Sequence, residues 1–549
     1  MAHYSRKGYK REPSPNLLPR PDNWEAVPSS PSSSLADKFS LSPDPTVWGS
    51  DLSRPEPDDN LHNPEIKNGK FVDGASSSGF ITGRGVANIG CLAILAVGLV
   101  ALFLGYPVVH WVEKTFLSSG TSGLPVNATG QIASIGNFGL IDLDTPFRCI
   151  HNKIPLFRQR DEAVDLHYWA TNNMEWYDPL AVTTANGALR ITLSATENHN
   201  LSYTGGLVTT WNKFCFTGGL LITNATLPGT TNIHGFWPAF WTMGNLGRAG
   251  YGASLDGMWP YTYDACDVGT APNQTLNGIP EIATTSGSTD QPYNGELSYL
   301  SGQRLSRCTC PGESHPGPIH ASDGSYVGRS APEIDVFEAQ IQDGEGAVSQ
   351  SGQWAPFNAG YVWLNTSDNM VIADHSISAQ NTYIGGAYQQ ATSVVTKTNQ
   401  RCYEMVENCY SAYGIEYKPG FNDAYISWIS DNKVSWTVNA AGLDKDPLTQ
   451  IDARPVPQEP MYILANLGMS QNFGGFDPKL LTFPATLSLD YVRVYQYEDS
   501  INIGCDPPDF PTQEYINTYI EAYTNPLLTT WVDDYKQTVP KNKFVDGGC

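Results

Sequence analysis

The amino-acid sequence predicts an all-β, antiparallel β-sandwich with long disulfide-braced loop insertions, preceded by a disordered tail and one transmembrane helix. Short runs of β-branched and aromatic residues, such as 187–193, 461–465 and 487–495, alternate with Gly, Asn, Asp and Pro. This pattern is typical of strands joined by turns, and long helical periodicity is scarce in this part of the chain. One uncharged apolar stretch, 86–109, follows a polar N-terminal part.

Residues 1–84 form the first segment. They are rich in Ser, Pro, Asn and Asp and show no sustained hydrophobic periodicity. Such a sequence cannot bury enough apolar surface to offset the entropy that it would lose on ordering. We therefore expect a disordered tail, which the next segment places in the cytoplasm.

Residues 85–110 are predicted to form a transmembrane signal-anchor helix. No charge interrupts 86–109, and at 1.5 Å per residue this stretch is about 36 Å long, enough to cross a bilayer. It starts too far from the N-terminus for a cleaved signal peptide, and the alternative is a buried helix of a soluble domain. Because Lys67, Lys70 and Arg84 precede it, the positive-inside rule favours a cytoplasmic N-terminus.

Two further signals agree with a single-pass type II membrane topology. The Asn-x-Ser/Thr glycosylation acceptors all follow the apolar stretch, and so does every cysteine except Cys91. Since disulfides form in the secretory pathway, most of these cysteines should pair, and their odd number leaves at least one free or bonded to another chain. The acceptors are Asn127, Asn200, Asn224, Asn273 and Asn365, and the cysteines are Cys149, Cys215, Cys266, Cys308, Cys310, Cys402, Cys409, Cys505 and Cys549.

The remaining segments are delimited by composition. Residues 111–145, rich in Gly, Ser and Thr, are predicted to form a lumenal stalk, and residues 146–500 the sandwich domain. Residues 501–549 are expected to be a C-terminal extension packed on that domain. The stretch 245–331 contains three cysteines among many Gly, Pro, Ser and Thr residues. We interpret it as a disulfide-braced insertion between two strands.

No metal and no other cofactor is predicted. Cys308, Cys310 and His315 lie close together in the sequence, but their spacing is poor for zinc and an oxidising compartment favours disulfides. Acidic side chains outnumber basic ones by 55 to 32, so nucleic acid is not an expected partner. The sequence identifies no protein partner.

Three acidic residues, Glu333, Asp335 and Glu338, stand among β-forming residues. In an ideal strand Glu333 and Asp335 share one face, whereas Glu338 points to the other. A one-residue β-bulge near Val336 and Phe337 would return Glu338 to the common face, and bulges are frequent next to active sites. The alternative interpretation is an exposed strand with acidic residues on its wet face.

With such a bulge, the Cα atoms of Glu333 and Glu338 would lie about 13–14 Å apart. If both side chains reach inward, their carboxyl groups can approach the roughly 5–5.5 Å separation of a retaining glycosidase. Asp335 would then keep the pKa values of its two neighbours apart through like-charge repulsion and hydrogen bonding.

Aromatic residues supply candidates for a carbohydrate-binding surface. The chain has 14 Trp and 28 Tyr, and flat rings pack well against sugar faces, although a large β core would explain the same composition. Trp237, Trp241 and Trp354 are the predicted sugar-stacking residues, with core packing as the alternative for each. Strand alternation puts Trp237 and Trp241 on one face but does not say whether that face is site or core.

The motif Glu333-Ile-Asp335-Val-Phe-Glu338 resembles that of glycoside hydrolase family 16, which carries Glu-x-Asp-x-(x)-Glu on a bulged strand of a jelly roll. Further segments are similar to neighbouring strands of that family: 234–244, 413–417, 426–428 and 489–495. More narrowly, the chain resembles the fungal β-glucan synthesis-associated membrane proteins, which combine this domain with one N-terminal signal anchor. The segments that carry this second resemblance are 165–171, 173–178, 259–261 and 503–507.

The resemblance implies a concanavalin A-like jelly roll in which Glu333 is the nucleophile, Glu338 the general acid/base and Asp335 a hydrogen-bonding assistant. It further implies a membrane-anchored, retaining β-glucan hydrolase or transglycosylase of cell-wall biosynthesis, with β-1,6-glucan as the expected polymer. The expected location is the endoplasmic reticulum, Golgi or plasma membrane, with the C-terminal domain lumenal or extracellular.

The chain departs from the family pattern at one place. Members usually carry an aromatic strand, ending in a Phe-x-Asp-Glu-Phe type sequence, ahead of the region that matches 165–171. Here 140–146 leads through the basic segment 147–160 directly into that region. We therefore expect an N-terminal strand of the sandwich to be missing, which would expose a sheet edge.

Two non-enzymatic functions fit the same topology. One is a membrane-anchored glucan-binding or scaffold protein for wall assembly, and the other is an anchored adhesion receptor. Binding alone does not require a nucleophile and an acid held close together, so the three carboxylates favour catalysis.

Overall fold

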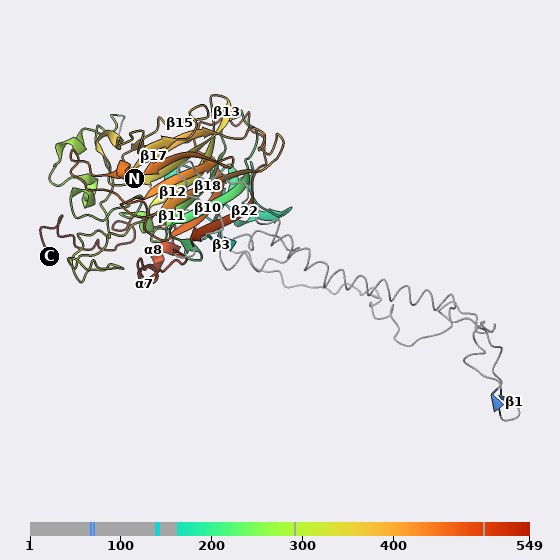
Figure 1. Cartoon of the computed structure of the whole chain (residues 1–549), viewed down its shortest axis with the longest axis horizontal. Helices are drawn as coiled ribbons and strands as arrows, with labels where there is room; N and C mark the ends of the chain where they lie inside the picture. The colour runs from blue at the N-terminus through green and yellow to red at the C-terminus, as the bar shows by residue number, and fades with distance from the viewer. Residues whose placement is uncertain (1–65, 68–69, 72–137, 143–161, 290–292, 498–499) are drawn as a thin grey trace, which may run out of the picture. The chain divides into compact units, whose positions relative to one another are not determined.

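The structure, a computed structural model of the chain, describes residues 66–67, 70–71, 138–142, 162–289, 293–497 and 500–549 (Figure 1). The chain divides into two compact units, His3–Ser119 and Gly120–Cys549. In the first unit, β1 (Ile66–Lys67) pairs antiparallel with β2 (Lys70–Phe71). This short ribbon falls within the stretch that was predicted to be a disordered tail.

Within the ranges that the structure describes, no helix is both long and apolar enough to cross a membrane. The predicted transmembrane segment 85–110 lies outside the described residues, as do Asn127, Cys91 and Cys149. Most of the predicted tail and stalk lies outside them as well.

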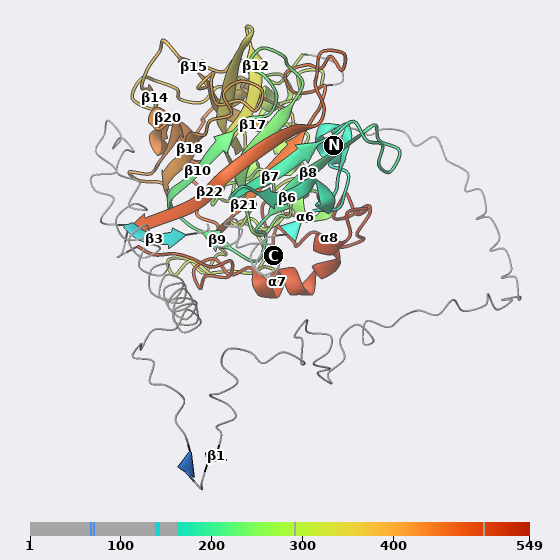
Figure 2. The ribbon, with the colours of Figure 1, turned by 90° about the vertical axis from the view of Figure 1, so that its right-hand side faces the viewer.

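Two large β-sheets form the second unit (Figures 1 and 2). The first sheet has the order β14-β20-β19-β18-β10-β22-β7-β6, and β3 joins it beside β22. Its strands are β3 (Phe138–Asp142), β6 (Val182–Ala185), β7 (Ala188–Leu193), β10 (Gly219–Thr226), β14 (Met370–Ile372), β18 (Ser411–Lys418), β19 (Tyr425–Ser430), β20 (Lys433–Asn439) and β22 (Ala485–Tyr497).

The second sheet has the order β15-β17-β13-β12-β11-β21-β8-β4, and three short strands pair with its members: β16 with β17, β5 with β8, and β9 with β21. Its strands are β4 (Glu162–Ala163), β5 (Glu175–Tyr177), β8 (Tyr203–Thr209), β9 (Cys215–Phe216), β11 (Trp237–Gly244), β12 (Glu333–Gln342), β13 (Glu345–Trp354), β15 (Ser378–Gln380), β16 (Gly385–Gly386), β17 (Gln389–Lys397) and β21 (Met461–Gly468). Apart from the parallel pair β5–β8, its pairings are antiparallel.

The main hydrophobic core lies between the two sheets. It combines buried side chains from the first sheet, such as Leu221 and Trp428, with others from the second, such as Phe240 and Ile463. These residues occupy alternate strand positions, so each sheet turns one apolar face toward the other. The predicted all-β antiparallel sandwich is thereby confirmed.

The first sheet contains a strand that the sequence analysis did not anticipate. β3 pairs along 493–497 of β22, while β7 pairs only with 485–489 of the same edge. The expectations that 111–145 is wholly a stalk and that an N-terminal strand is missing are therefore wrong for 138–142. The physical reason is that β22 extends beyond β7, and β3 pairs with the backbone groups that β7 leaves unpaired.

The outer face of the second sheet is partly covered by two segments far apart in sequence. Leu246 and Met258, from the insertion between β11 and β12, pack with Tyr515 and Trp531 of the C-terminal part in one cluster of buried side chains. That cluster includes Trp241 of β11. The helices that belong to these covering segments are short: α6 (Gly252–Leu255), α7 (Gln513–Thr518) and α8 (Ile520–Thr524), together with the 3-10 helices Val268–Thr270, Pro272–Gln274 and Glu281–Thr284.

Disulfides brace this covering layer, as predicted. Every cysteine within the described ranges is paired, and Cys308 and Cys310, the sequence's nearest approach to a zinc motif, belong to two different bonds. The bonds are Cys215–Cys505, Cys266–Cys308, Cys310–Cys549 and Cys402–Cys409.

One buried acid gives the sandwich a pH-dependent stability. Glu416 on β18 is 3% exposed and accepts a hydrogen bond from the Tyr425 hydroxyl. Burial raises the pKa of Glu416 to about 7, although the bond from Tyr425 opposes this effect. The folded protein therefore holds this proton more tightly than the unfolded chain, so its contribution to stability falls as the pH rises from about 4.5 to about 7.

We predict that Glu416→Gln, which stays neutral and can still accept from Tyr425, becomes more stable relative to the wild type as the pH rises. The difference in free energy of unfolding should change by about 3 kcal/mol between pH 4.5 and 8. Urea denaturation of both proteins at several pH values measures it. Glu345→Gln, at a half-exposed surface position, is the control, and a difference that does not vary with pH would contradict the prediction.

Candidate active site

The three acidic side chains of β12 lie on one face of the second sheet. The pairing of β12 shifts by one residue between Asp335 and Glu338, which leaves Val336 as the extra residue of a β-bulge. On each neighbouring strand the partners of the three acids are two positions apart and therefore share a face. These partners are Met243, Trp241 and Ala239 on β11, and Gln353, Ser351 and Ser349 on β13. The predicted bulge, and the common face that it creates, are confirmed.

Asp335 is the buried member of this carboxylate group. It is 2% exposed, whereas Glu333 and Glu338 keep part of their surface accessible. Its Oδ2 accepts hydrogen bonds from Ser351 Oγ at 2.8 Å and from Gln353 Nε2 at 2.9 Å. The inner acid is thus fixed by protein groups, and only the outer two can meet a ligand.

Each outer glutamate accepts a hydrogen bond from one tryptophan. Trp259 Nε1, in the insertion between β11 and β12, donates to Glu333 Oε2 at 2.6 Å. Trp237 Nε1, at the start of β11, donates to Glu338 Oε1 at 3.0 Å. Such bonds strengthen when the acceptor is ionised and hold the carboxyl group in one orientation. The two glutamates are therefore oriented separately, from different parts of the chain.

Burial raises the pKa of all three acids. For Glu333 the charges of Asp335 and Glu338 raise the pKa further, while the bond from Trp259 opposes them. For Glu338 the charge of Asp335 adds to burial, and the bond from Trp237 opposes both. Side-chain hydrogen bonds partly offset the burial of Asp335. Three adjoining carboxyl groups cannot all ionise in such surroundings, so the group retains protons that an isolated surface acid would lose.

The structure separates the three predicted sugar-stacking tryptophans. Trp237 is partly exposed at the site, but Phe473 stacks on its ring at 4.5 Å. Trp241 faces the same side of the sheet and is covered, with its indole N–H bonded to Asn466 Oδ1. Trp354 is 1% exposed and belongs to the core between the sheets.

The stacking role predicted for Trp354 is therefore wrong, and that of Trp241 does not fit its burial. Trp354 follows Gln353, whose side chain reaches Asp335, so alternation along β13 turns Trp354 to the opposite, inner face. Trp241 faces the site side of the sheet, but the insertion and the C-terminal segment cover it. Of the three, Trp237 is the one whose indole N–H is bonded to a carboxylate of the site.

Several residues at the site were not assigned a role from sequence. Trp259 and Tyr168 appeared only as parts of segments that resemble the family. In the structure Trp259 bonds to Glu333. Tyr168 lies near the same carboxylate, since its pKa is raised by burial and then by the charge of Glu333. Ser351 and Gln353 could have been found, since residues that pair with Asp335 and Glu333 across an antiparallel hairpin share their face.

The glycosylation acceptors that the structure describes differ in exposure. Asn200 and Asn273 are exposed, whereas Asn224 and Asn365 are partly buried.

Within the described part of the chain, no cluster of three His, Cys, Asp or Glu side chains could hold a metal ion.

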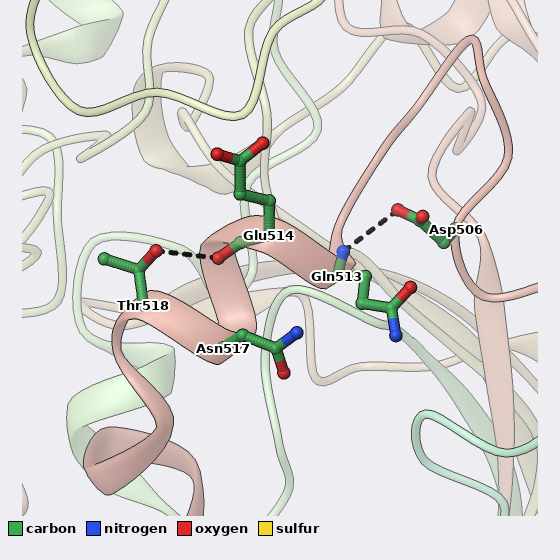
Figure 3. Close-up of a pocket in the computed structure, with 5 residues that line it drawn as sticks. All are labelled: Asp506, Gln513, Glu514, Asn517 and Thr518. Carbon is green, nitrogen blue, oxygen red and sulfur yellow. Dashed lines mark hydrogen bonds between the residues drawn. The ribbon is translucent and has the colours of Figure 1, made fainter.

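A polar surface pocket on α7 contains none of the site residues (Figure 3). Asp506, one of its lining residues, accepts backbone hydrogen bonds from Thr512 and Gln513 and so satisfies the start of α7. The pocket is lined by Asp506, Gln513, Glu514, Asn517 and Thr518. Its other charged side chain, that of Glu514, is also acidic. The pocket offers no arrangement comparable to the three carboxylates of β12.

Comparison with known proteins identifies relatives over nearly the whole chain. The family model described as beta-glucan synthesis-associated protein SKN1/KRE6/Sbg1 matches residues 48–160 and 156–549. The beta-glucan synthesis-associated protein SKN1 of Candida albicans is 38% identical over 528 residues, which are 91% of this chain and 67% of that protein. KRE6 of Saccharomyces cerevisiae, of the same description, is 35% identical over 533 residues, 91% of this chain and 69% of that protein.

Among solved structures, the laminarinase catalytic domain from Thermotoga maritima matches with a TM-score of 0.35 and 16% sequence identity. The match covers 66% of this chain and 98% of that one. That likeness is too distant to support a statement about function.

We predict that Trp237→Phe raises the pKa of Glu338. The substitution keeps an aromatic ring against Phe473 but removes the N–H that stabilises the ionised carboxylate. Infrared titration of the carboxyl groups, as a difference between variant and wild type, measures the shift. Trp354→Phe, which loses a core hydrogen bond to Thr392, is the control, and its carboxyl groups should titrate as in the wild type. If the titration curve of Trp237→Phe also coincides with that of the wild type, the prediction is refuted.

Proposed function

The chain belongs to the family of beta-glucan synthesis-associated proteins SKN1, KRE6 and Sbg1, and on this basis we propose that it is a membrane-anchored, retaining glycosidase or transglycosylase. Its substrate would be the β-glucan of the fungal cell wall. Of the β-glucan linkages, we propose β-1,6, in keeping with the family resemblance of the sequence.

One observation carries the proposal. Glu333 and Glu338 share a sheet face, each is partly exposed, and each is oriented by an indole N–H, with the buried Asp335 between them. A retaining glycosidase needs a nucleophilic carboxylate and a carboxylic acid on either side of the scissile bond. A protein that only binds glucan has no need to bring three acids together at the cost of their mutual repulsion.

In the first step, a carboxylate oxygen of Glu333 attacks the anomeric carbon while the glycosidic C–O bond breaks. Glu338, whose pKa burial and Asp335 raise, starts protonated and passes its proton to the leaving oxygen. The products are a glycosyl ester on Glu333 and a shortened glucan. Only ionised Glu333 can attack, so in the reactive form of the site Glu333 has lost its proton while Glu338 keeps its own, next to the charged Asp335.

In the second step, a hydroxyl oxygen attacks the same carbon and the ester bond to Glu333 breaks. Glu338, now a carboxylate, takes the proton of the attacking hydroxyl, and the configuration of the anomeric carbon is retained. Water as the acceptor gives hydrolysis, and a second glucan gives a new glycosidic bond. We propose transfer as the principal reaction, because hydrolysis alone cannot build a polymer.

We further propose that residues 85–110 anchor the protein as a single-pass type II membrane protein of the secretory pathway. The domain that carries the site would then be lumenal or extracellular. The paired cysteines and the exposed acceptors Asn200 and Asn273 support this orientation, since disulfides and N-glycans are both added in that compartment.

We predict that Glu333→Gln and Glu338→Gln each lower transfer and hydrolysis of defined β-glucans by about 10³-fold or more, because each removes one of the two groups that the mechanism needs. The full-length protein would be assayed by product analysis and by the anomer first released. Glu345→Gln, on the adjoining strand β13 at the surface, is the matched control. If both site variants keep wild-type activity, Glu333 and Glu338 do not carry the reaction; if the wild type turns over no defined β-glucan and both variants still support wall assembly, the chain is a glucan-binding scaffold instead.

We predict that Asn200→Gln and Asn273→Gln each lower the apparent mass of the protein made in fungal cells by one N-glycan. Asn277→Gln, an exposed asparagine outside any acceptor motif, should leave the mass unchanged. Protease treatment of sealed microsomes should spare the glycosylated domain. A domain that carries no glycan and is digested in sealed microsomes would refute the proposed topology.

A further inference from the structure

The bulge in β12 leaves backbone groups that its neighbouring strands do not pair. Val336 has no partner, since on β13 Asp335 is opposite Ser351 and Glu338 is opposite Ser349. An unpaired carbonyl in the interior destabilises the fold unless a donor reaches it. The donors in this protein come from inside the sandwich.

Gln350 supplies the bond to Val336. Its side chain extends from β13 into the core and is fully buried. Its Nε2 donates to the carbonyl oxygen of Val336 at 3.0 Å and to that of Ile429, in the opposite sheet, also at 3.0 Å. Its Oε1 accepts from the hydroxyl of Ser435 at 2.6 Å. All hydrogen-bonding groups of the Gln350 amide are therefore engaged. One N–H bonds to the bulge, whereas the second N–H and the oxygen bond to the opposite sheet.

Ser435 is itself the extra residue of a second bulge, in β20. The pairs that flank it are Trp428 with Trp436 and Ile429 with Val434. The Ser435 hydroxyl also lies 3.1 Å from the carbonyl of Trp428, whose indole N–H donates to the carbonyl of Asp335 at 2.7 Å. The two bulges, one in each sheet, are thus joined across the core by side-chain hydrogen bonds. At the bulge of β12 these bonds reach the carbonyls of Asp335 and Val336.

We infer that Gln350 is a positioning residue of the active site, which fixes Glu338 relative to Glu333 by holding the carbonyl of Val336 from inside the core. The inference rests on the proposed function. Gln350 itself faces away from the ligand side of the sheet. Because Val336 lies between the two glutamates, movement of its carbonyl changes their separation, and a misplacement of about 1 Å can lower a rate by about 100-fold.

The test compares two buried glutamines in the full-length protein. Gln350→Met keeps the length of the side chain but removes the amide. Gln274→Met is the matched control, because Gln274, in the insertion between β11 and β12, is also buried and bonds to the backbone of Phe357 through both ends of its amide. On a β-glucan oligosaccharide, Gln350→Met should lower kcat by about 100-fold with KM within about twofold of wild type. The control should lose thermal stability only.

A milder variant covers the case in which Gln350→Met fails to fold. Ser435→Ala, in the opposite sheet, removes one anchor of Gln350 and should lower kcat by about tenfold, but should have no further effect in the Gln350→Met background. Wild-type kcat per folded molecule in Ser435→Ala or in Gln350→Met would overturn the inference, as would additive effects.

The same assay separates this inference from the proposed function. If Glu333→Gln keeps its activity, the proposed function fails and the positioning role fails with it. If Glu333→Gln is inactive while Gln350→Met behaves like Gln274→Met, the positioning role alone is overturned.

Discussion

The site depends on the hydrogen bonds that the core donates to the unpaired backbone of β12. Alternation in a regular strand would turn Glu338 away from Glu333, so the one extra residue at Val336 brings the carboxylates together. The same extra residue breaks the ladder, and the resulting buried carbonyls need donors. Trp428 and Gln350 supply them. The polar groups of this core thus allow a local irregularity that an entirely apolar core would not tolerate.

A second constraint is the layer that covers the outer face of the same sheet. The insertion between β11 and β12 contributes Trp259 to Glu333, and the bond Cys310–Cys549 ties that insertion to the C-terminal segment. The covering layer removes Trp241 from contact with solvent while leaving Glu333 and Glu338 partly exposed. It raises the pKa of the acids by burial and orients one of them. The insertion therefore acts on the chemistry of the site as well as on the shape of the domain.

The sequence predicted the sandwich, the disulfide-braced insertion and the bulge because each has a local signature. Strand alternation and turn residues mark the β-strands, and three acids at the spacing of Glu333, Asp335 and Glu338 can share a face only if one residue is extra. The missed strand β3 had a local signature too, a short apolar run, but it lay in a segment whose overall composition is that of a stalk. The place of β3 beside β22 depends on how far β7 extends along the same edge.

What the sequence by itself determined is which residues of a strand share a face, since that follows from backbone geometry alone. Only the tertiary structure decided what lies against each face. Trp237 and Trp241 are four residues apart and share one face of β11, yet Trp241 is covered and Trp237 contacts Glu338. The difference arises from the insertion after β11 and from the C-terminal part, which pack on Trp241. The donors to the bulge, Trp428 and Gln350, likewise come from other strands. Contacts of this kind leave no period in the sequence, because they join strands whose order in space is set only when both sheets close on one core.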